Sequence, residues 1–183
     1  MVLTESTEVE LGMEAPAFDL PATDGSRYTL ADFDEASALV VMFICNHCPY
    51  VKAVRGRLIE LAEQMSDRPV AFVAISSNDA ERYPEDSFER MKEVAEEYDY
   101  PFPYLYDESQ RVARAYGAVA TPDIFVFDDE RTLGYRGRVD DNWKEPSKVT
   151  RRDLKLAIEA ILEGRRPDFE QQPSMGCSIK WKE

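Results

Sequence analysis

An uninterrupted run of apolar residues, 38–44 (ALVVMFI), ends at Cys45 and gives way within a few residues to a helical pattern. The run is short and rich in β-branched and aromatic residues, as is typical of a strand buried on both faces of a parallel sheet. From Cys48 to Met65, apolar residues recur at spacings of three and four, which predicts an amphipathic helix. The sequence therefore predicts a buried strand that passes directly into a helix, with two cysteines at the junction.

The rest of the chain alternates in the same way. We expect further strands at 70–75, 104–106, 124–127 and 133–139. We also expect one helix that begins near Pro84, a second that begins near Ser109, and a last helix over 147–163. Asp24-Gly25, between two segments that carry apolar residues, predicts a hairpin before the first buried strand. This order predicts a mainly parallel sheet, covered on both faces and closed by an antiparallel strand pair. The length of 183 residues suits one core, so we expect a single domain, 1–183, on which an irregular tail, 165–183, packs.

Charge and cysteine content narrow the function classes and the compartment. The net charge of −14 disfavours nucleic acid and anionic membranes as partners, and no apolar stretch approaches the length of a membrane span. Residues 1–11 lack the basic and apolar regions of a signal peptide. Three cysteines are too few for a secreted disulfide scaffold. We therefore expect a cytoplasmic protein in which closely spaced cysteines serve redox or metal chemistry.

The pair Cys45 and Cys48, in the sequence CNHC, carries the predicted chemistry. At a helix N-terminus, unpaired N–H groups and the positive end of the helix dipole favour a thiolate on the first cysteine. The second cysteine lies one turn further on the same face, within disulfide reach of the first. His47 lies between them and can carry a positive charge, which would further stabilise a thiolate at Cys45. The pattern predicts a redox-active dithiol.

Two other interpretations of the pair stay open. A structural zinc site needs four ligands, and only Cys177 and His47 could complete one, although His47 lies inside the loop that the pair closes. Two merely structural cysteines would not require a strand-to-helix junction. We expect neither a metal nor a cofactor.

A proline just before a predicted strand is the second notable element. Thr121-Pro122 precedes the strand expected at 124–127. Proline at such a place is either a cis residue in a tight turn or an ordinary trans proline at a strand start.

Taken together, these features resemble the thioredoxin-like superfamily, in particular its redoxin branch of alkyl hydroperoxide reductase and thiol-specific antioxidant proteins. The segment 12–20 (GMEAPAFDL) with Asp24-Gly25 is similar to the entry hairpin of that branch. Cys45-x-x-Cys48 and Thr121-Pro122 are similar to its active-site loop and cis-proline loop. The ending GCSIKW, 176–181, is similar to the tail of a peroxiredoxin-like subgroup. The resemblance implies a thioredoxin-like three-layer α/β/α sandwich with an N-terminal β-hairpin extension and a C-terminal tail.

The resemblance also implies a thiol-disulfide oxidoreductase. Cys45 would be the exposed nucleophile, Cys48 the resolving thiol, and Thr121-Pro122 the backbone edge that lies against the pair and docks a substrate. The partners would be thiol or disulfide proteins or low-molecular-weight thiols, together with a thioredoxin-type reductant. In two respects the chain departs from thioredoxins: Ile44 stands where they usually carry tryptophan, and the run 38–44 lacks their buried acid. The sequence thus names no proton acceptor for Cys48.

The alternative is a peroxiredoxin-like thiol peroxidase. Peroxiredoxins carry Thr-x-x-Cys-Pro at this junction, so Cys48 would be the peroxidatic thiol and Cys45 would stand in place of the threonine. The activating arginine of that family falls roughly where this chain has Pro122 and Asp123, and losing both hydroxyl and guanidinium would weaken the positioning of a peroxide. Cys45 or Cys177 would resolve the oxidised thiol.

Cys177 itself has two interpretations. It is either an additional resolving thiol that the tail brings near the pair, or a buried small residue beside Trp181. A metal-binding or degenerate thioredoxin-like module remains a third class of function for the whole chain.

Overall fold

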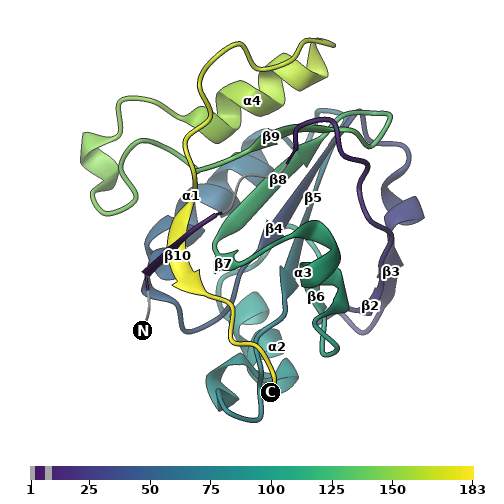
Figure 1. The fold of residues 1–183 in the computed structure, drawn as a ribbon, viewed down its shortest axis with the longest axis vertical. Coiled ribbons are helices and arrows are strands. Elements are labelled where there is room, and N and C mark those ends of the chain that lie inside the picture. The colour runs from purple at the N-terminus through teal and green to yellow at the C-terminus, as the bar shows by residue number, and fades with distance from the viewer. Residues whose placement is uncertain (1–2, 7–9) are drawn as a thin grey trace.

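A five-stranded sheet lies at the centre of the computed structural model, which describes residues 3–6 and 10–183 (Figure 1). Its strands lie in the order β6 (Tyr104–Tyr106), β5 (Val70–Ser76), β4 (Ala38–Phe43), β8 (Asp123–Phe127) and β9 (Leu133–Arg136). β4, β5 and β6 are parallel, whereas β8 is antiparallel to both β4 and β9. The closing antiparallel pair is confirmed. The sheet is mixed rather than mainly parallel, because the chain re-enters it beside β4 from the opposite end.

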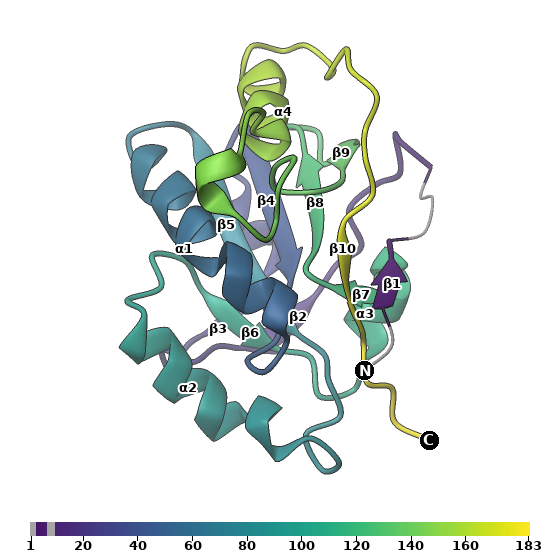
Figure 2. The ribbon, with the colours of Figure 1, turned by 90° about the vertical axis from the view of Figure 1, so that its left-hand side faces the viewer.

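Alternate residues of β4 contribute to two separate cores, because successive side chains of a strand point to opposite faces. The even-numbered residues of β4 pack with α1 (Pro49–Gln64), α2 (Phe88–Glu97) and α4 (Asp153–Leu162). The odd-numbered residues pack with α3 (Arg111–Tyr116) and with the hairpin of β2 (Asp19–Pro21) and β3 (Arg27–Thr29). Figure 2 shows α1, α2 and α4 on one side of the sheet and α3 on the other. The predicted three-layer sandwich and its N-terminal hairpin are confirmed.

Three helices begin later than their patterns predict. A single 3₁₀ turn, Pro84–Asp86, precedes α2, for which Ser87 is the N-cap, and α3 begins after Gln110 rather than at Ser109. The helix expected over 147–163 starts only at Asp153, after a 3₁₀ turn at Pro146–Lys148. Within the described part of the chain, no helix has both the length and the apolar character that a membrane span requires.

Polar contacts to Asp141 explain the shortened α4. The Asp141 carboxylate accepts hydrogen bonds from the Thr150 N–H, at 2.9 Å, and from the Thr150 hydroxyl, and the Asp141 N–H donates to the Arg151 carbonyl at 3.1 Å. These contacts hold residues 149–152 outside α4, although the apolar spacing of this segment is compatible with a helix.

The C-terminal tail, expected to be irregular, contains a strand. β10 (Met175–Ser178) lies antiparallel between β1 (Leu3–Glu5) and β7 (Ala120–Thr121), at the margin of the main sheet (Figure 1). The sequence MGCS is too short and too rich in small residues to give a strand pattern, so only its tertiary pairing makes it one. The expectation that 1–11 holds no signal segment concerns a stretch of which 1–2 and 7–9 lie outside the described residues.

A buried ion pair fixes the turn between β7 and β8. Asp123, the first residue of β8, accepts hydrogen bonds from Arg136 Nε at 3.0 Å and from Arg136 Nη2 at 2.6 Å. The Val119 N–H donates to the same carboxylate at 3.4 Å. Both side chains of the pair are buried. The contacts tie β9 to the two ends of the segment that carries Thr121 and Pro122.

We expect Arg136→Leu to lower the free energy of unfolding by about 3–5 kcal/mol, because it leaves a buried carboxylate without its partner. The double variant Asp123→Asn/Arg136→Leu removes that unpaired charge and should recover much of the loss. Urea unfolding, followed by circular dichroism, measures both. An equal loss in the single and the double variant would show that the ion pair does not set the stability of this turn.

Candidate active site

The two predicted loops meet. Cys45 follows the end of β4, and Cys48 is the N-cap of α1, with Pro49 at the first helical position, where its missing N–H costs little. The Thr121–Pro122 peptide bond is cis. Thr121 contacts both cysteines: its hydroxyl lies 3.4 Å from Cys45 Sγ, and its carbonyl oxygen lies 3.1 Å from Cys48 Sγ. The predicted adjacency of the cysteine pair and the proline loop is therefore present in the structure.

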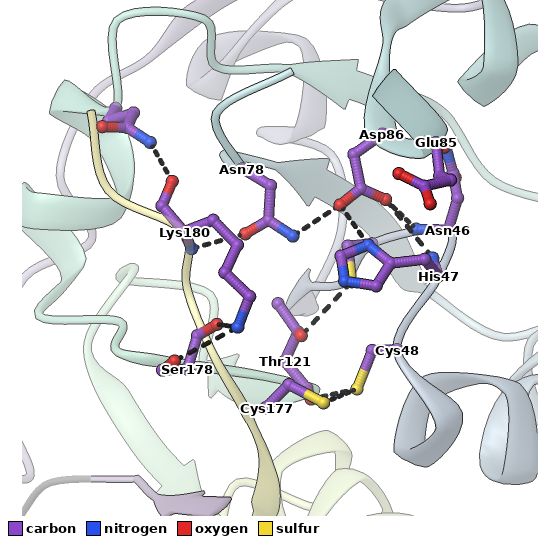
Figure 3. A network of polar contacts seen from close by, with 12 residues as sticks. Asn46, His47, Cys48, Asn78, Glu85, Asp86, Thr121, Cys177, Ser178 and Lys180 are labelled. Carbon is purple, nitrogen blue, oxygen red and sulfur yellow. Dashed lines mark hydrogen bonds and ion pairs between the residues drawn. The ribbon is translucent and has the colours of Figure 1, made fainter. Parts of the chain in front are cut away.

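The third cysteine joins the same cluster. Cys177 Sγ lies 2.9 Å from Cys48 Sγ (Figure 3), and all three thiols are buried. Of the two interpretations of Cys177, burial beside Trp181 is wrong. Trp181 packs with the core on the other face of the sheet, where the Arg114 guanidinium lies 4.3 Å above its ring. Cys177 belongs to the core that holds Cys45 and Cys48.

The three thiols differ in their affinity for a proton. Hydrogen bonds from Cys45 and then from Cys177 lower the pKa of Cys48 to about 5, against the opposing effect of burial. The hydrogen bond to Cys48, burial and the negative charge of Asp86 raise the pKa of Cys45 well above its ordinary value. Burial and the hydrogen bond to Cys48 raise the pKa of Cys177 to about 12. These directions favour a thiolate on Cys48, between the thiols of Cys45 and Cys177.

The expectation that Cys45 is the exposed, acidic thiol is wrong. Cys48, not Cys45, takes the N-cap position of α1, where a thiolate is favoured. Cys45 is not exposed either, at 1%, and it faces the charge of Asp86. The order of acidity within the pair is therefore the reverse of the predicted one.

A buried carboxylate that the sequence did not reveal organises the loop between the cysteines. Asp86 Oδ1 accepts the backbone N–H groups of Asn46, at 2.8 Å, and His47, at 3.3 Å. Asp86 Oδ2 accepts from His47 Nδ1 at 2.6 Å and from the Asn78 amide at 2.7 Å (Figure 3). The Tyr83 ring stacks on the imidazole, 5.7 Å between centroids. Among 36 acidic residues, most of them on the surface, no local pattern marks Asp86 as one of the few buried acids.

His47 lies next to Cys45, as predicted, but its ring is held by Asp86. A ring nitrogen of His47, a carboxylate oxygen of Asp86 and Cys45 Sγ all lie within 4.8 Å of one another. Such a trio has the residue types of a metal site. Each Asp86 oxygen, however, already accepts two N–H groups, which is the arrangement of a hydrogen-bonded network rather than of a free ligand.

An open cavity of about 430 Å³ adjoins the site on the far side of Pro122. Tyr50, Trp143 and Met175 contribute to its wall, and the Tyr50 and Trp143 rings lie 4.4 Å apart. Tyr50 follows Cys48 by two residues, and Met175 precedes Cys177 by two. The cavity thus lies beside segments of the chain that carry Cys48 and Cys177, and Pro122 of the cis-proline loop is part of its wall.

Comparison with known proteins identifies the family of this chain. The model of the AhpC/TSA family matches residues 11–136. The chain belongs to the AhpC/TSA family. A crystal structure of an uncharacterised conserved protein from Geobacillus kaustophilus is 50% identical, with a TM-score of 0.94 over 100% of this chain and 97% of that one.

More distant matches share the fold. The thiol-disulfide oxidoreductase ResA of Bacillus thuringiensis is 22% identical over 127 residues, which is 69% of each chain. The thioredoxin domain of a thiol-disulfide oxidoreductase from Bacteroides vulgatus is 20% identical, with a TM-score of 0.61 over 70% of this chain and 89% of that one. Homologues are thus thiol-disulfide oxidoreductases, and the AhpC/TSA family also includes peroxiredoxins. The predicted family, the thioredoxin-like fold and an oxidoreductase activity are confirmed.

We expect the reduced AhpC/TSA-family protein to show one thiolate titration, with a midpoint near pH 5, from Cys48. The Cys45 hydrogen bond is the largest cause that lowers this pKa, so Cys45→Ala should raise the midpoint, and Cys177→Ala should raise it by less. Thiolate absorbance in the far ultraviolet, recorded against pH with Cys48→Ala as the baseline, measures the shift. A midpoint that persists near pH 5 in Cys48→Ala would assign the thiolate to another residue.

Proposed function

We propose that this protein is a thiol-disulfide oxidoreductase in which Cys45 and Cys48 form the reacting couple and Cys48 is the nucleophile. The observation that carries the proposal is the position of Cys48 at the N-cap of α1, beside the thiol of Cys45 in the same loop, where a low pKa favours the thiolate. A thiolate is the species that attacks a disulfide, and a neighbouring thiol is what completes the exchange.

The exchange takes two steps with a substrate disulfide. The Cys48 thiolate attacks one substrate sulfur, forms a mixed disulfide, and releases the other substrate sulfur as a thiolate, which takes a proton from solvent. Cys45 then loses its proton and attacks Cys48 Sγ, which closes the Cys45–Cys48 disulfide and releases the second substrate thiolate. Two electrons pass from the dithiol to the substrate, and the reverse sequence oxidises a substrate dithiol.

The second step needs a proton acceptor for Cys45, because the hydrogen bond to Cys48, burial and the charge of Asp86 all raise the pKa of this thiol. The His47 imidazole lies beside it, and Asp86 fixes the ring through Nδ1. This is the relation of thiol, base and orienting carboxylate that activates weak nucleophiles generally. His47 and Asp86 therefore serve the resolving thiol and not, as predicted, a thiolate on Cys45.

The substrates belong to the class of thiols and disulfides, as those of the homologues do. We extend this class to disulfide proteins and low-molecular-weight thiols, with a thioredoxin-type protein as the reductant and the cytoplasm as the compartment. Thr121 and Pro122 form the backbone edge at which a substrate would lie, because the Thr121 carbonyl contacts Cys48 Sγ.

A second candidate function, thiol peroxidase, is favoured by one observation. Cys48 precedes Pro49 at the start of α1 and is the thiolate of the site, as a peroxidatic cysteine must be. Against it, the sulfur contacts two thiols and a carbonyl oxygen, whereas the one nearby hydroxyl, of Thr121, lies on Cys45. We expect slow reaction with peroxides, because these neighbours do not position peroxide oxygens.

Substitution of single cysteines separates the two functions. In Cys45→Ser/Cys177→Ser, Cys48 should hold the mixed disulfide with a substrate, because no thiol remains to resolve it. Cys48→Ser should abolish turnover. Mass spectrometry of the acid-quenched protein and a disulfide-reduction assay measure these outcomes. If instead the double variant forms sulfenic acid rapidly and stoichiometrically with hydrogen peroxide, the peroxidase assignment replaces this one.

Asp86→Asn should slow the resolving step by about 10²-fold, since a positioned general base contributes at least that much, and should affect the first attack by less, because the Cys48 thiolate keeps its hydrogen bond from Cys45. The mixed disulfide should therefore accumulate in single-turnover experiments, and rising pH should relieve the defect because solvent then deprotonates Cys45. The matched control is Asp79→Asn, another buried acid of the same connection, whose carboxylate accepts from the Glu81 N–H instead. Equal slowing of both steps in Asp86→Asn would indicate a purely structural role.

A further inference from the structure

The C-terminal strand β10 pairs with the backbone edge that borders the active site. In the antiparallel register, Cys177 lies opposite Thr121, and Ser178 opposite Ala120. The Ile179 N–H continues the contact to the Val119 carbonyl at 2.9 Å. β1 covers the outer edge of β10 (Figure 2). An extended chain on this edge thus brings its cysteine to Cys48, which is the position that any extended disulfide substrate would take.

The sequence of β10 is adapted to this edge. A Cβ atom at Gly176 would lie 2.0 Å from the Thr121 carbonyl oxygen, so only glycine permits the approach. The Ser174 hydroxyl donates to the Pro122 carbonyl at 2.6 Å, which holds the strand at its start. Further along, the Asn78 side chain accepts the Lys180 N–H at 2.9 Å. Three anchors therefore set the position of Cys177 along the edge.

The two sulfurs are placed to react. Side chains of a strand alternate between faces, and the pairing with Thr121 turns Cys177 inward, to 2.9 Å from Cys48 Sγ. A disulfide bond is about 2.05 Å long, so a small movement of two side chains closes one. Cys48 is already hydrogen-bonded to Cys45 on its other side. It can therefore form a disulfide with either neighbour, but with only one at a time.

We propose that β10 is a built-in substrate strand and that Cys177 is a third redox thiol, which forms a Cys48–Cys177 disulfide that exchanges with Cys45. The inference rests on the proposed function of the Cys45–Cys48 couple and names a further thiol for it. In the first step, Cys48 and a substrate disulfide form the mixed disulfide and one substrate thiol. Cys177 then loses its proton and attacks Cys48 Sγ, releasing the second substrate thiol.

The Cys48–Cys177 disulfide is then exchanged for a Cys45–Cys48 disulfide, and this exchange needs no further oxidant. Cys45 loses a proton to the His47–Asp86 pair and attacks Cys48 Sγ, so that the Cys45–Cys48 bond forms and the Cys48–Cys177 bond breaks. Cys177 leaves as a thiolate and recovers a proton, and no electrons are exchanged with another molecule. While β10 is paired, the edge of β7 is closed to other extended chains, so a protein substrate reaches Thr121 only after β10 leaves.

The test maps disulfides in the full-length protein after limited oxidation with glutathione disulfide, acid quenching and alkylation. Trypsin leaves Cys45 and Cys48 together in peptide 28–52 and Cys177 in peptide 166–180. A Cys48–Cys177 bond therefore joins two peptides, whereas a Cys45–Cys48 bond stays within one. We expect the joined pair in the wild type and, as the sole disulfide, in Cys45→Ser. It should be absent from Cys48→Ser.

A control variant that moves the tail thiol by one residue tests whether the Cys48–Cys177 bond depends on the register of β10 or only on the presence of a reactive thiol in the tail. Cys177→Ser/Ser178→Cys keeps the thiol in the same tail but turns it to the opposite face of β10, and the joined pair should be lost. Gly176→Ala, which removes the close approach to Thr121, should lose it as well while retaining the Cys45–Cys48 bond. Far-ultraviolet circular dichroism confirms that each variant is folded.

The outcomes distinguish the two proposals. If Cys45–Cys48 forms but Cys48–Cys177 does not, even in Cys45→Ser, the third thiol is excluded and the proposed oxidoreductase stands. If the register control is joined as efficiently as the wild type, a loose tail explains the bond and the substrate-strand assignment fails. If neither disulfide forms, the proposed function fails together with this inference.

Discussion

A buried thiolate has to be stabilised without the water that it has lost, and the architecture of the site follows from that requirement. Cys48 Sγ is fully buried, and hydrogen bonds from two thiols, Cys45 and Cys177, lower its pKa to about 5. One donor comes from the end of a central strand and the other from the C-terminal strand, so both must be held in place. The cost of desolvating a charge makes these contacts essential, because a buried charge without hydrogen bonds would take up a proton instead.

Asp86 is the buried negative charge that faces Cys45. Together with the hydrogen bond to Cys48 and burial, its charge raises the pKa of Cys45, which keeps that thiol protonated and able to donate to Cys48. The same carboxylate binds both backbone N–H groups of the Asn46–His47 segment and orients the imidazole. One buried acid thus shapes the loop, contributes to the raised pKa of Cys45, and positions a base for the later step. Thr121 in β7 also contacts both cysteines, with its hydroxyl next to Cys45 Sγ and its carbonyl oxygen next to Cys48 Sγ.

The sequence predicts the frame of this site well and its electrostatics poorly. The apolar run before Cys45 and the helical spacing after Cys48 are local patterns, and each corresponds to an element in the structure. The acidity of the two thiols depends instead on the direction of their mutual hydrogen bond and on burial, with Asp86 and Cys177 adding to the effect through tertiary contacts from far along the chain. β10 was not predicted for the same reason, since its pairing with β7 rather than its composition makes it a strand. Spacing alone cannot show which cysteine of a pair takes the N-cap position.

The two thiols that flank Cys48 have different means of losing a proton, and this difference gives the cluster a direction. Cys45 faces a histidine and a carboxylate, a base that can accept its proton. Cys177 instead lies near Lys180, whose positive charge lowers the pKa of Cys177 against the larger effect of burial. The Lys180 ammonium is held by the carbonyl and hydroxyl of Ser178, at 2.8 and 3.3 Å, so its charge stays beside the strand. A cation stabilises a thiolate as it forms and as it leaves, whereas a base removes a proton and retains it. The base beside Cys45 therefore gives the displacement of Cys177 its proton acceptor, and Lys180 partly offsets the effect of burial on the Cys177 thiolate that this displacement releases.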